Sequence, residues 1–302
     1  MITGKAGAAV LSIISNSLLI LLKGVAGAVT GSIAIITEAV HSAVDLLASI
    51  FAYFSIRKAE QPADADHPYG HEKAENIAAG AEAMLILVGA LVISYEAVRR
   101  LEGGAEIESL GFGIAVIAFS MVVNIVVSSF LYSRARVHDS PALEGDAAHL
   151  RADALTSVAV LAGLVLVAIT DEPAFDSIAA LVVGVAIVGS GVRLMMRAGR
   201  VLMDEAPPPE ELDQIEAAIA AARPPEMVGY HKLRARKAGA RRHIDMHVQF
   251  RAGTTLEQAH QQAHALRAAI EAAIPHADVL IHSEPETSYV PPDFDVGPLR
   301  HG

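Results

Sequence analysis

The chain contains no cysteine and carries little charge. None of its 302 residues is cysteine, and only 19% are aspartate, glutamate, lysine or arginine. The absence of cysteine excludes disulfide bonds and thiolate metal ligands. Any bound metal must therefore be held by imidazole and carboxylate groups, which favours zinc and similar divalent ions over Cu(I). The formal net charge of −11 argues against nucleic-acid binding.

Apolar residues dominate what is present. They make up 53% of the chain, and the mean hydropathy is +0.41. This composition is too apolar for an ordinary soluble domain and too polar for a chain embedded in a membrane throughout. We therefore expect a membrane all-α domain of six transmembrane helices over residues 1–204. A small α+β cytoplasmic domain over residues 205–288 and a loose tail over residues 289–302 should follow.

Six apolar runs predict the transmembrane helices, because each is long enough to supply the roughly 20 residues that cross a hydrocarbon core. They cover residues 6–30, 31–57, 76–98, 109–133, 143–170 and 175–196. The first run is too long for the apolar core of a signal peptide. Lysine and arginine concentrate on the side of the two termini, which places both termini in the cytoplasm by the positive-inside rule. Arg99 and Arg100, in an opposite connection, depart from this rule.

The character of the chain changes after Arg200. Three prolines at 207–209 interrupt the sequence, and the last of them opens an alanine-rich helix to about Ala222. Two strand-like runs follow, and in the second, residues 241–250, apolar and polar side chains alternate. Residues 256–273 predict a helix and residues 277–282 a final strand. This order indicates a small α+β domain with its sheet covered on one face.

Two histidine–aspartate pairs with identical spacing lie in apolar runs. His41 and Asp45 belong to the second run, and His149 and Asp153 belong to the fifth. Because residues i and i+4 are neighbours on one helix face, each pair presents an imidazole beside a carboxylate. Two such helices packed face to face would supply the four ligands of a tetrahedral Zn²⁺ ion. The alternative is that the histidines pack in the core and the aspartates hydrogen-bond to neighbours, although ionisable residues in mid-membrane usually line a pathway.

Such a site can couple metal movement to protons. Histidine binds metal only when neutral and aspartate when ionised, so metal binding displaces protons. A quartet that faces one side and then the other would exchange a divalent ion for protons by alternating access.

An intramembrane metallo-hydrolase would need a catalytic water and a general base, and the His-Glu-x-x-His pattern is absent. We therefore do not expect an enzyme. A membrane metal sensor would have no use for two charged pairs in mid-membrane.

Further candidate ligands lie outside the apolar runs. Asp64, His67 and His71 fall within eight residues of the connection between the second and third runs. They could bind a metal or form a solvated polar loop. Eight of the thirteen histidines lie beyond residue 200, so the terminal domain could bind the same ion. Several of these histidines are expected at the surface, with His243 and His276 the first candidates.

With these residues in view, the chain resembles the cation diffusion facilitator family of divalent-metal/proton antiporters over nearly its whole length. The resemblance rests on the six spans, the paired His-x-x-x-Asp motifs, the segment His67-Pro68-Tyr69-Gly70-His71-x-Lys73-x-Glu75 and the short terminal domain. It implies a homodimeric efflux transporter in a bacterial inner membrane. It also implies a metallochaperone-like αββαβ fold for the cytoplasmic domain.

The resemblance implies three metal sites. The transport site is His41, Asp45, His149 and Asp153; the loop site is Asp64, His67 and His71; the cytoplasmic site, shared across the homodimer interface, is His231, His247, His260 and His282 with Glu284. Similar members often carry aspartate in place of Glu284, and the longer side chain should alter the geometry of a bridged two-metal site. Lys73 and Asp204 stand where the family is expected to form an interlock between its membrane and cytoplasmic parts.

Metal choice depends on His41. Family members with two His-Asp pairs look like zinc transporters, whereas those with aspartate in place of His41 look broader and accept cadmium or iron. This agrees with the preference of zinc for imidazole. We expect Zn²⁺, with Cd²⁺, Co²⁺ and Ni²⁺ as companions. The alternatives are a broader Zn/Cd/Co/Ni/Fe transporter of the same family or a membrane metal sensor.

Overall fold

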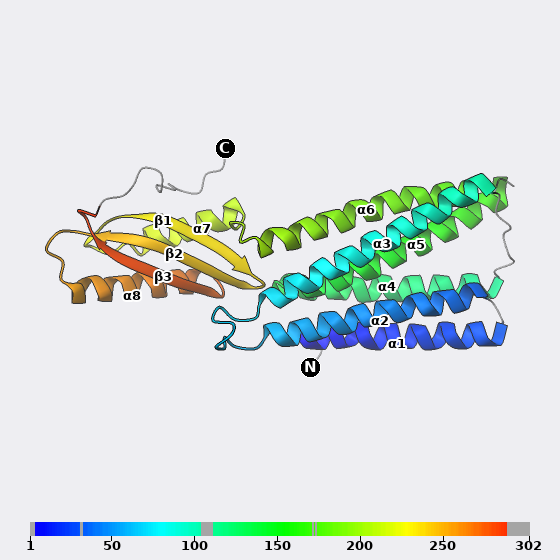
Figure 1. Cartoon of the computed structure of the whole chain (residues 1–302), viewed down its shortest axis with the longest axis horizontal. Coiled ribbons are helices and arrows are strands. Elements are labelled where there is room, and N and C mark those ends of the chain that lie inside the picture. Colours follow the sequence, from blue (N-terminus) through cyan, green and yellow to red (C-terminus); the bar gives the residue numbers. More distant parts are fainter. Residues whose placement is uncertain (1–3, 31–32, 104–110, 171, 173, 289–302) are drawn as a thin grey trace. The chain divides into compact units, whose positions relative to one another are not determined.

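The computed structural model describes residues 4–30, 33–103, 111–170, 172 and 174–288 (Figure 1). The chain divides into two compact units, Met1–Gly199 and Arg200–Gly302. The loose tail predicted for residues 289–302 lies outside the described residues.

The first unit is built from six long helices. They are α1 (Lys5–Thr30), α2 (Ile33–Ala59), α3 (Lys73–Gly103), α4 (Gly111–His138), α5 (Pro141–Thr170) and α6 (Ala174–Leu202). All six are long and apolar enough to cross a membrane, which confirms the predicted membrane all-α class. Several are longer than the apolar runs that predicted them. α3 begins three residues before the run at residue 76, because polar residues can continue a helix beyond its apolar part.

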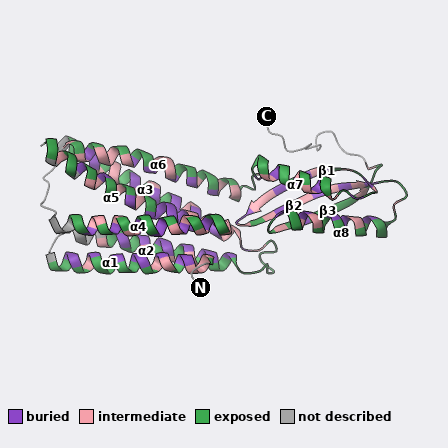
Figure 2. Cartoon of the chain, turned by 180° about the vertical axis from the view of Figure 1, so that it is seen from behind, coloured by how far each residue is buried: buried purple, intermediate pink, exposed green. Residues whose placement is uncertain are grey.

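Small side chains lie where these helices contact one another. Ala8 of α1, Ala78 of α3 and Ala147 of α5 are buried in one core with Leu131 of α4. Small residues let helix backbones approach closely, which is how helices pack in lipid. Large apolar side chains such as Leu91 face outward instead, and Figure 2 shows exposed positions along all six helices. An apolar outer surface suits contact with lipid. The helices can lie there because their backbone groups hydrogen-bond within each helix.

The second unit is an αββαβ domain. Its elements are α7 (Pro209–Ala221), β1 (Met227–Ala238), β2 (Arg241–Phe250), α8 (Leu256–Ala273) and β3 (Ala277–Pro285). The sheet order is β1-β2-β3, with β1 antiparallel and β3 parallel to the central β2. The predicted order of elements is confirmed. Thr255 and Gln258 form a capping box that starts α8, the helix that connects the two parallel strands.

The core of this domain lies between one face of the sheet and the two helices. Ile244 and Val248 of β2 are buried with Ile215 of α7 and Ile270 of α8. Because side chains alternate along a strand, the intervening polar residues of β2 lie on the opposite face. The sequence alternation therefore predicted correctly which face the helices cover.

One surface prediction is wrong. His243 was expected at the surface, but it is buried, with 8% of its area exposed. It sits on the central strand, in register with Arg236 of β1 and Asp278 of β3, so neighbours flank it on both sides. Its Nδ1 atom lies 3.4 Å from Asp278. His276 is exposed, as expected.

Candidate functional site

The two histidine–aspartate pairs face each other across α2 and α5. The Nε2 atom of His149 lies 3.0 Å from Oδ1 of Asp45 and 3.9 Å from Oδ2 of Asp153. The Nε2 atom of His41 lies 3.6 Å from Oδ1 of Asp153 and 3.9 Å from Oδ1 of Asp45. Each histidine thus approaches the aspartate of its own helix and that of the other helix.

These separations suit a single small ion. A tetrahedral zinc ion with bonds of about 2.0–2.1 Å holds its ligand atoms about 3.3 Å apart. The four nitrogen–oxygen distances, from 3.0 to 3.9 Å, bracket that value. Ligand atoms of His41, Asp45 and Asp153 lie within 4.8 Å of one another, and His149 is not part of that group. The arrangement could therefore close on a divalent ion with small side-chain movements.

Burial makes this cluster favourable for a divalent cation. The side chains of Asp45, Asp153 and His149 are 7%, 17% and 8% exposed, whereas that of His41 is 51% exposed. Two carboxylates taken out of water need compensating charge, and one divalent cation cancels both. The exposed imidazole leaves one side of the cluster open.

A buried polar network supports the cluster from α1. Ser49, one turn beyond Asp45 on α2, donates to Oδ1 of Asp146 on α5 at 2.9 Å. Asn16 of α1 donates to Ser49 at 2.9 Å, and Lys23 of α1 donates to Ser42 of α2 at the same distance. These bonds tie α1 and α5 to the helix that carries Asp45. Sequence reasoning did not identify them, although a lysine or an asparagine inside an apolar run is the signal that could have done so.

The loop between α2 and α3 gathers the second set of predicted ligands. His67 Nδ1 and His71 Nε2 lie 3.1 Å and 3.2 Å from the two oxygens of Asp64, and the three ligand atoms fall within 4.8 Å of one another. Gly70 has a φ of +89°, a conformation that favours glycine, and it turns the chain between the two histidines. A metal with nitrogen and oxygen ligands fits this cluster.

Hydrogen bonds stabilise the ionised form of Asp64, which is the form that binds metal. The backbone N–H of His67 donates to its carboxylate at 2.7 Å. This hydrogen bond, with a further one from the His67 side chain, lowers the pKa of Asp64 below its usual value. Asp64 and His67 are exposed while His71 is buried, so the loop offers two solvated ligands and one shielded ligand.

The third cluster lies in a row across the sheet of the second unit. His231 of β1, His247 of β2 and His282 of β3 are partners in register, and Glu284 lies two residues beyond His282. Positions two apart on a strand share a face, so the glutamate projects on the same side as His282. The sequence predicted these residues together but could not show that the strand register aligns them.

Glu284 is the centre of this row. Its Oε2 lies 2.9 Å from Nε2 of His231, and its Oε1 lies 2.6 Å from Nδ1 of His247 and 3.6 Å from Nε2 of His282. Partial burial raises the pKa of Glu284, but the hydrogen bonds with His231 and His247 outweigh it, so the net pKa is lowered. His231, His247 and Glu284 could together hold a metal ion.

Two predicted residues lie apart from these clusters. His260 is exposed on α8 beside His264, with ring centroids 4.4 Å apart, and it is not among the grouped ligands in the described part of the chain. Its predicted role depends on a second subunit and stays a prediction. Asp204 accepts a hydrogen bond from Arg236 at 3.0 Å, and its predicted interlock with Lys73 also stays a prediction.

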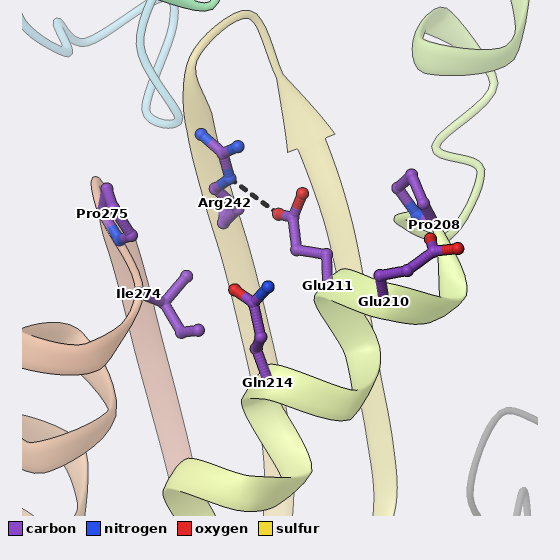
Figure 3. A pocket seen from close by; sticks show the side chains of 7 residues that line it. All are labelled: Pro208, Glu210, Glu211, Gln214, Arg242, Ile274 and Pro275. Atoms are coloured by element: carbon purple, nitrogen blue, oxygen red, sulfur yellow. Dashed lines mark hydrogen bonds and ion pairs between the residues drawn. The ribbon is translucent and has the colours of Figure 1, made fainter.

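A separate cavity in the second unit is lined by charged and polar side chains together with proline and isoleucine. It has a volume of about 410 Å³, and Glu210, Glu211, Gln214 and Arg242 line it (Figure 3). The guanidinium of Arg242 donates to Glu211 at 2.7 Å, which pairs that carboxylate with a positive charge. None of the residues that line it is a histidine.

Comparison with known proteins covers nearly the whole chain. The family model described as the cation efflux transmembrane domain matches residues 9–203, and the model described as the cytoplasmic domain of the cation efflux protein matches residues 207–286. The uncharacterized transporter sll1263 of Synechocystis is 34% identical over 264 residues, which cover 87% of this chain and 85% of the relative. The cation-efflux pump FieF of Citrobacter koseri is 34% identical over 278 residues, 92% of each chain. A solved structure of CzrB in its Zn form is 33% identical and covers 29% of this chain and 99% of its own, with a TM-score of 0.27.

Proposed function

Because the chain belongs to the cation efflux family, the cation diffusion facilitators, we propose that it exports a divalent metal cation, foremost Zn²⁺, in exchange for protons. The convergence of His41, Asp45, His149 and Asp153 from two helices long enough to span a membrane supports this proposal most directly. The similarity to the cation-efflux pump FieF along 92% of the chain supports it independently.

The donor set favours zinc among the divalent ions. Two imidazoles and two carboxylates suit Zn²⁺, and a chain without cysteine offers nothing to ions that demand thiolate. Cd²⁺, Co²⁺ and Ni²⁺ accept the same donors and are proposed as secondary substrates. Oxygen-only sites suit Mn²⁺, so it should be a poor substrate.

Proton exchange follows from the same ligands. Histidine must lose its proton before it binds metal, and aspartate must be ionised. A cluster that binds metal on one side of the membrane and protons on the other returns to its starting state after each cycle. We propose cytoplasmic termini and export from the cytoplasm of a bacterium, in which an inward proton gradient drives the metal outward.

We propose that the loop and cytoplasmic clusters bind metal but do not form part of the transport pathway. Asp64, His67 and His71 lie in a connection between spans, and the row centred on Glu284 lies in the second unit. The second unit matches a dimer-type cytoplasmic domain, which supports a homodimer. Metal bound there would regulate transport or stabilise the dimer.

The test is zinc flux into proteoliposomes that contain the purified full-length chain and a zinc-sensitive dye. We expect zinc uptake to increase when the proton gradient is directed out of the liposome, against the movement of zinc. We expect Asp45→Ala and Asp153→Ala each to abolish it. Asp213→Ala, which removes an exposed aspartate from α7, is the matched control and should transport like the wild type. Flux that ignores the proton gradient would overturn the coupling, and wild-type flux in both aspartate variants would overturn the site.

A further inference from the structure

A carboxylate that the transport cluster does not include lies behind one of its histidines. Oε2 of Glu82 on α3 is 3.5 Å from Nδ1 of His149, on the side of the imidazole ring away from Asp45. Glu82 and His149 are 1% and 6% exposed. Neither Glu82 oxygen, nor Nδ1 of His149, has a hydrogen-bond partner among the described residues.

The packing of α3 against α5 brings the two groups together. Gly145 lies one turn before His149 on α5, and a Cβ atom there would be 3.1 Å from Cγ of Glu82 and 3.1 Å from Cα of Ala79. Glycine therefore lets α5 approach α3 closely at this level. Figure 1 shows the two helices side by side. The stem of Glu82 thus lies against Gly145, and its carboxylate points to His149, one turn further along α5.

The two ring nitrogens of His149 have different surroundings. Nε2 faces the carboxylates of Asp45 and Asp153, where a metal would lie, and Nδ1 faces only Glu82 among the ion-pair partners within 4.0 Å in the described chain. A histidine that binds a metal through one nitrogen almost always donates the other N–H to an oxygen, and this contact fixes the tautomer and the ring orientation.

We propose that Glu82 is a positioning residue of the transport site, which accepts the Nδ1–H of His149 and so directs the Nε2 lone pair at the metal. This inference rests on the proposed function, because it needs His149 to bind the transported ion. A buried carboxylate with no partner is costly. The Nδ1–H of His149 provides that partner once the ring and the carboxylate close the remaining gap.

In this role Glu82 would change the affinity of the transport site for metal and would not change the folding of the chain. Removal of an outer-shell partner typically weakens metal binding by about 10–100-fold. Glu82→Ala should raise the KM for Zn²⁺ transport by that amount, and Glu82→Gln, which keeps an amide oxygen as acceptor, should raise it less. A purely structural role would reduce the amount of folded protein, and therefore the maximal rate, without a change in KM.

The experiment measures KM and maximal rate separately for the full-length chain in proteoliposomes. Glu75→Gln is the matched control, because Glu75 is also a buried carboxylate of α3 but bonds to Lys5 and Ser140 instead. Its KM should stay within about twofold of wild type, because it does not lie behind a proposed ligand. Gly145→Ala provides an independent variant that keeps Glu82 but crowds its stem, and its KM should also rise.

A double-variant comparison tests whether Glu82 acts through His149. In a His149→Asp background there is no Nδ1–H to orient, so zinc affinity measured by calorimetry should no longer respond to Glu82→Ala. In a His41→Asp background the full effect should persist.

The possible failures can be told apart. If the wild-type chain carries no zinc flux, the proposed function fails. If it does carry flux but His149→Ala transports zinc like the wild type, His149 is not a ligand and the positioning role is overturned. If His149→Ala abolishes transport but the folded Glu82 and Gly145 variants keep the wild-type KM, the positioning role alone is overturned. An equal response to Glu82→Ala with and without the imidazole at 149 would also overturn it.

Discussion

The Nε2 atom of His149 lies 3.0 Å from Oδ1 of Asp45, although 104 residues separate them in the sequence. The contact joins α5 to α2 and brings together one ligand from each helical pair. A nitrogen and an oxygen at this distance share a proton or, when each moves slightly, a metal ion. A proton and a metal ion therefore compete for the same two atoms, and the proposed exchange depends on this competition.

Removal of charge at Asp45 should be more damaging than removal of an outer-shell group. Asp45→Asn preserves the size of the side chain but leaves the bound cation with one buried carboxylate fewer. We expect zinc flux to fall by more than about 100-fold, beyond the range typical of outer-shell residues. Asp176→Asn on α6, outside the quartet, should stay close to wild type in the same flux assay, and a comparable loss in both variants would point to a general effect of charge.

Substitution of the half-exposed histidine should change which metal is carried. His41→Asp replaces an imidazole with a harder oxygen donor, so the preference for zinc over iron and manganese should fall by roughly tenfold. The measurement is competition between the ions for flux in one liposome preparation. An unchanged preference would show that His41 does not contribute to selectivity.

The loop cluster should bind its own ion. His71→Ala removes a buried imidazole that faces Asp64, and it should lower the metal bound to the full-length chain by about one ion. Metal analysis after dialysis gives the count. Asp66→Ala, which alters an exposed neighbour in the same loop, is the control and should leave the count unchanged. Equal counts in wild type and His71→Ala would contradict a loop site.

Release of metal from the cytoplasmic row should follow the titration of histidine. The hydrogen bonds with His231 and His247 lower the pKa of Glu284, so this ligand stays ionised as the pH falls through 6 and 5. Histidine binds metal only when it is neutral, so protons compete with the metal for these ligands. We expect the zinc affinity of the row, measured with the transport quartet and loop ligands replaced, to fall by at least about tenfold as the pH is lowered from about 7 to about 5. Release only below about pH 4.5 would assign control to the carboxylate instead.

Helix geometry alone predicted much of the candidate site. The i, i+4 spacing required His41 beside Asp45 and His149 beside Asp153, because 3.6 residues complete one turn. Nothing in the spacing required α2 to face α5. That relationship arises from tertiary packing, in which small residues such as Ala147 lie buried where helices distant in sequence meet.

Three other features could not be predicted from the sequence, each for a physical reason. Glu82 is a single glutamate in an apolar run, and its relationship to His149 exists only once α3 lies against α5. His243 was expected at the surface, whereas it occupies the central strand of the sheet and is buried between its neighbours there. The role predicted for His260 depends on a second copy of the chain, whose contacts a single sequence does not describe.

The most direct test of the central claim is anomalous X-ray diffraction at the zinc edge from crystals of the full-length chain grown with Zn²⁺. We predict a peak between α2 and α5, within about 2.0–2.2 Å of His41, Asp45, His149 and Asp153. Zinc density confined to the loop and the cytoplasmic row, with the two helical pairs turned away from each other in every crystal form, would contradict the account.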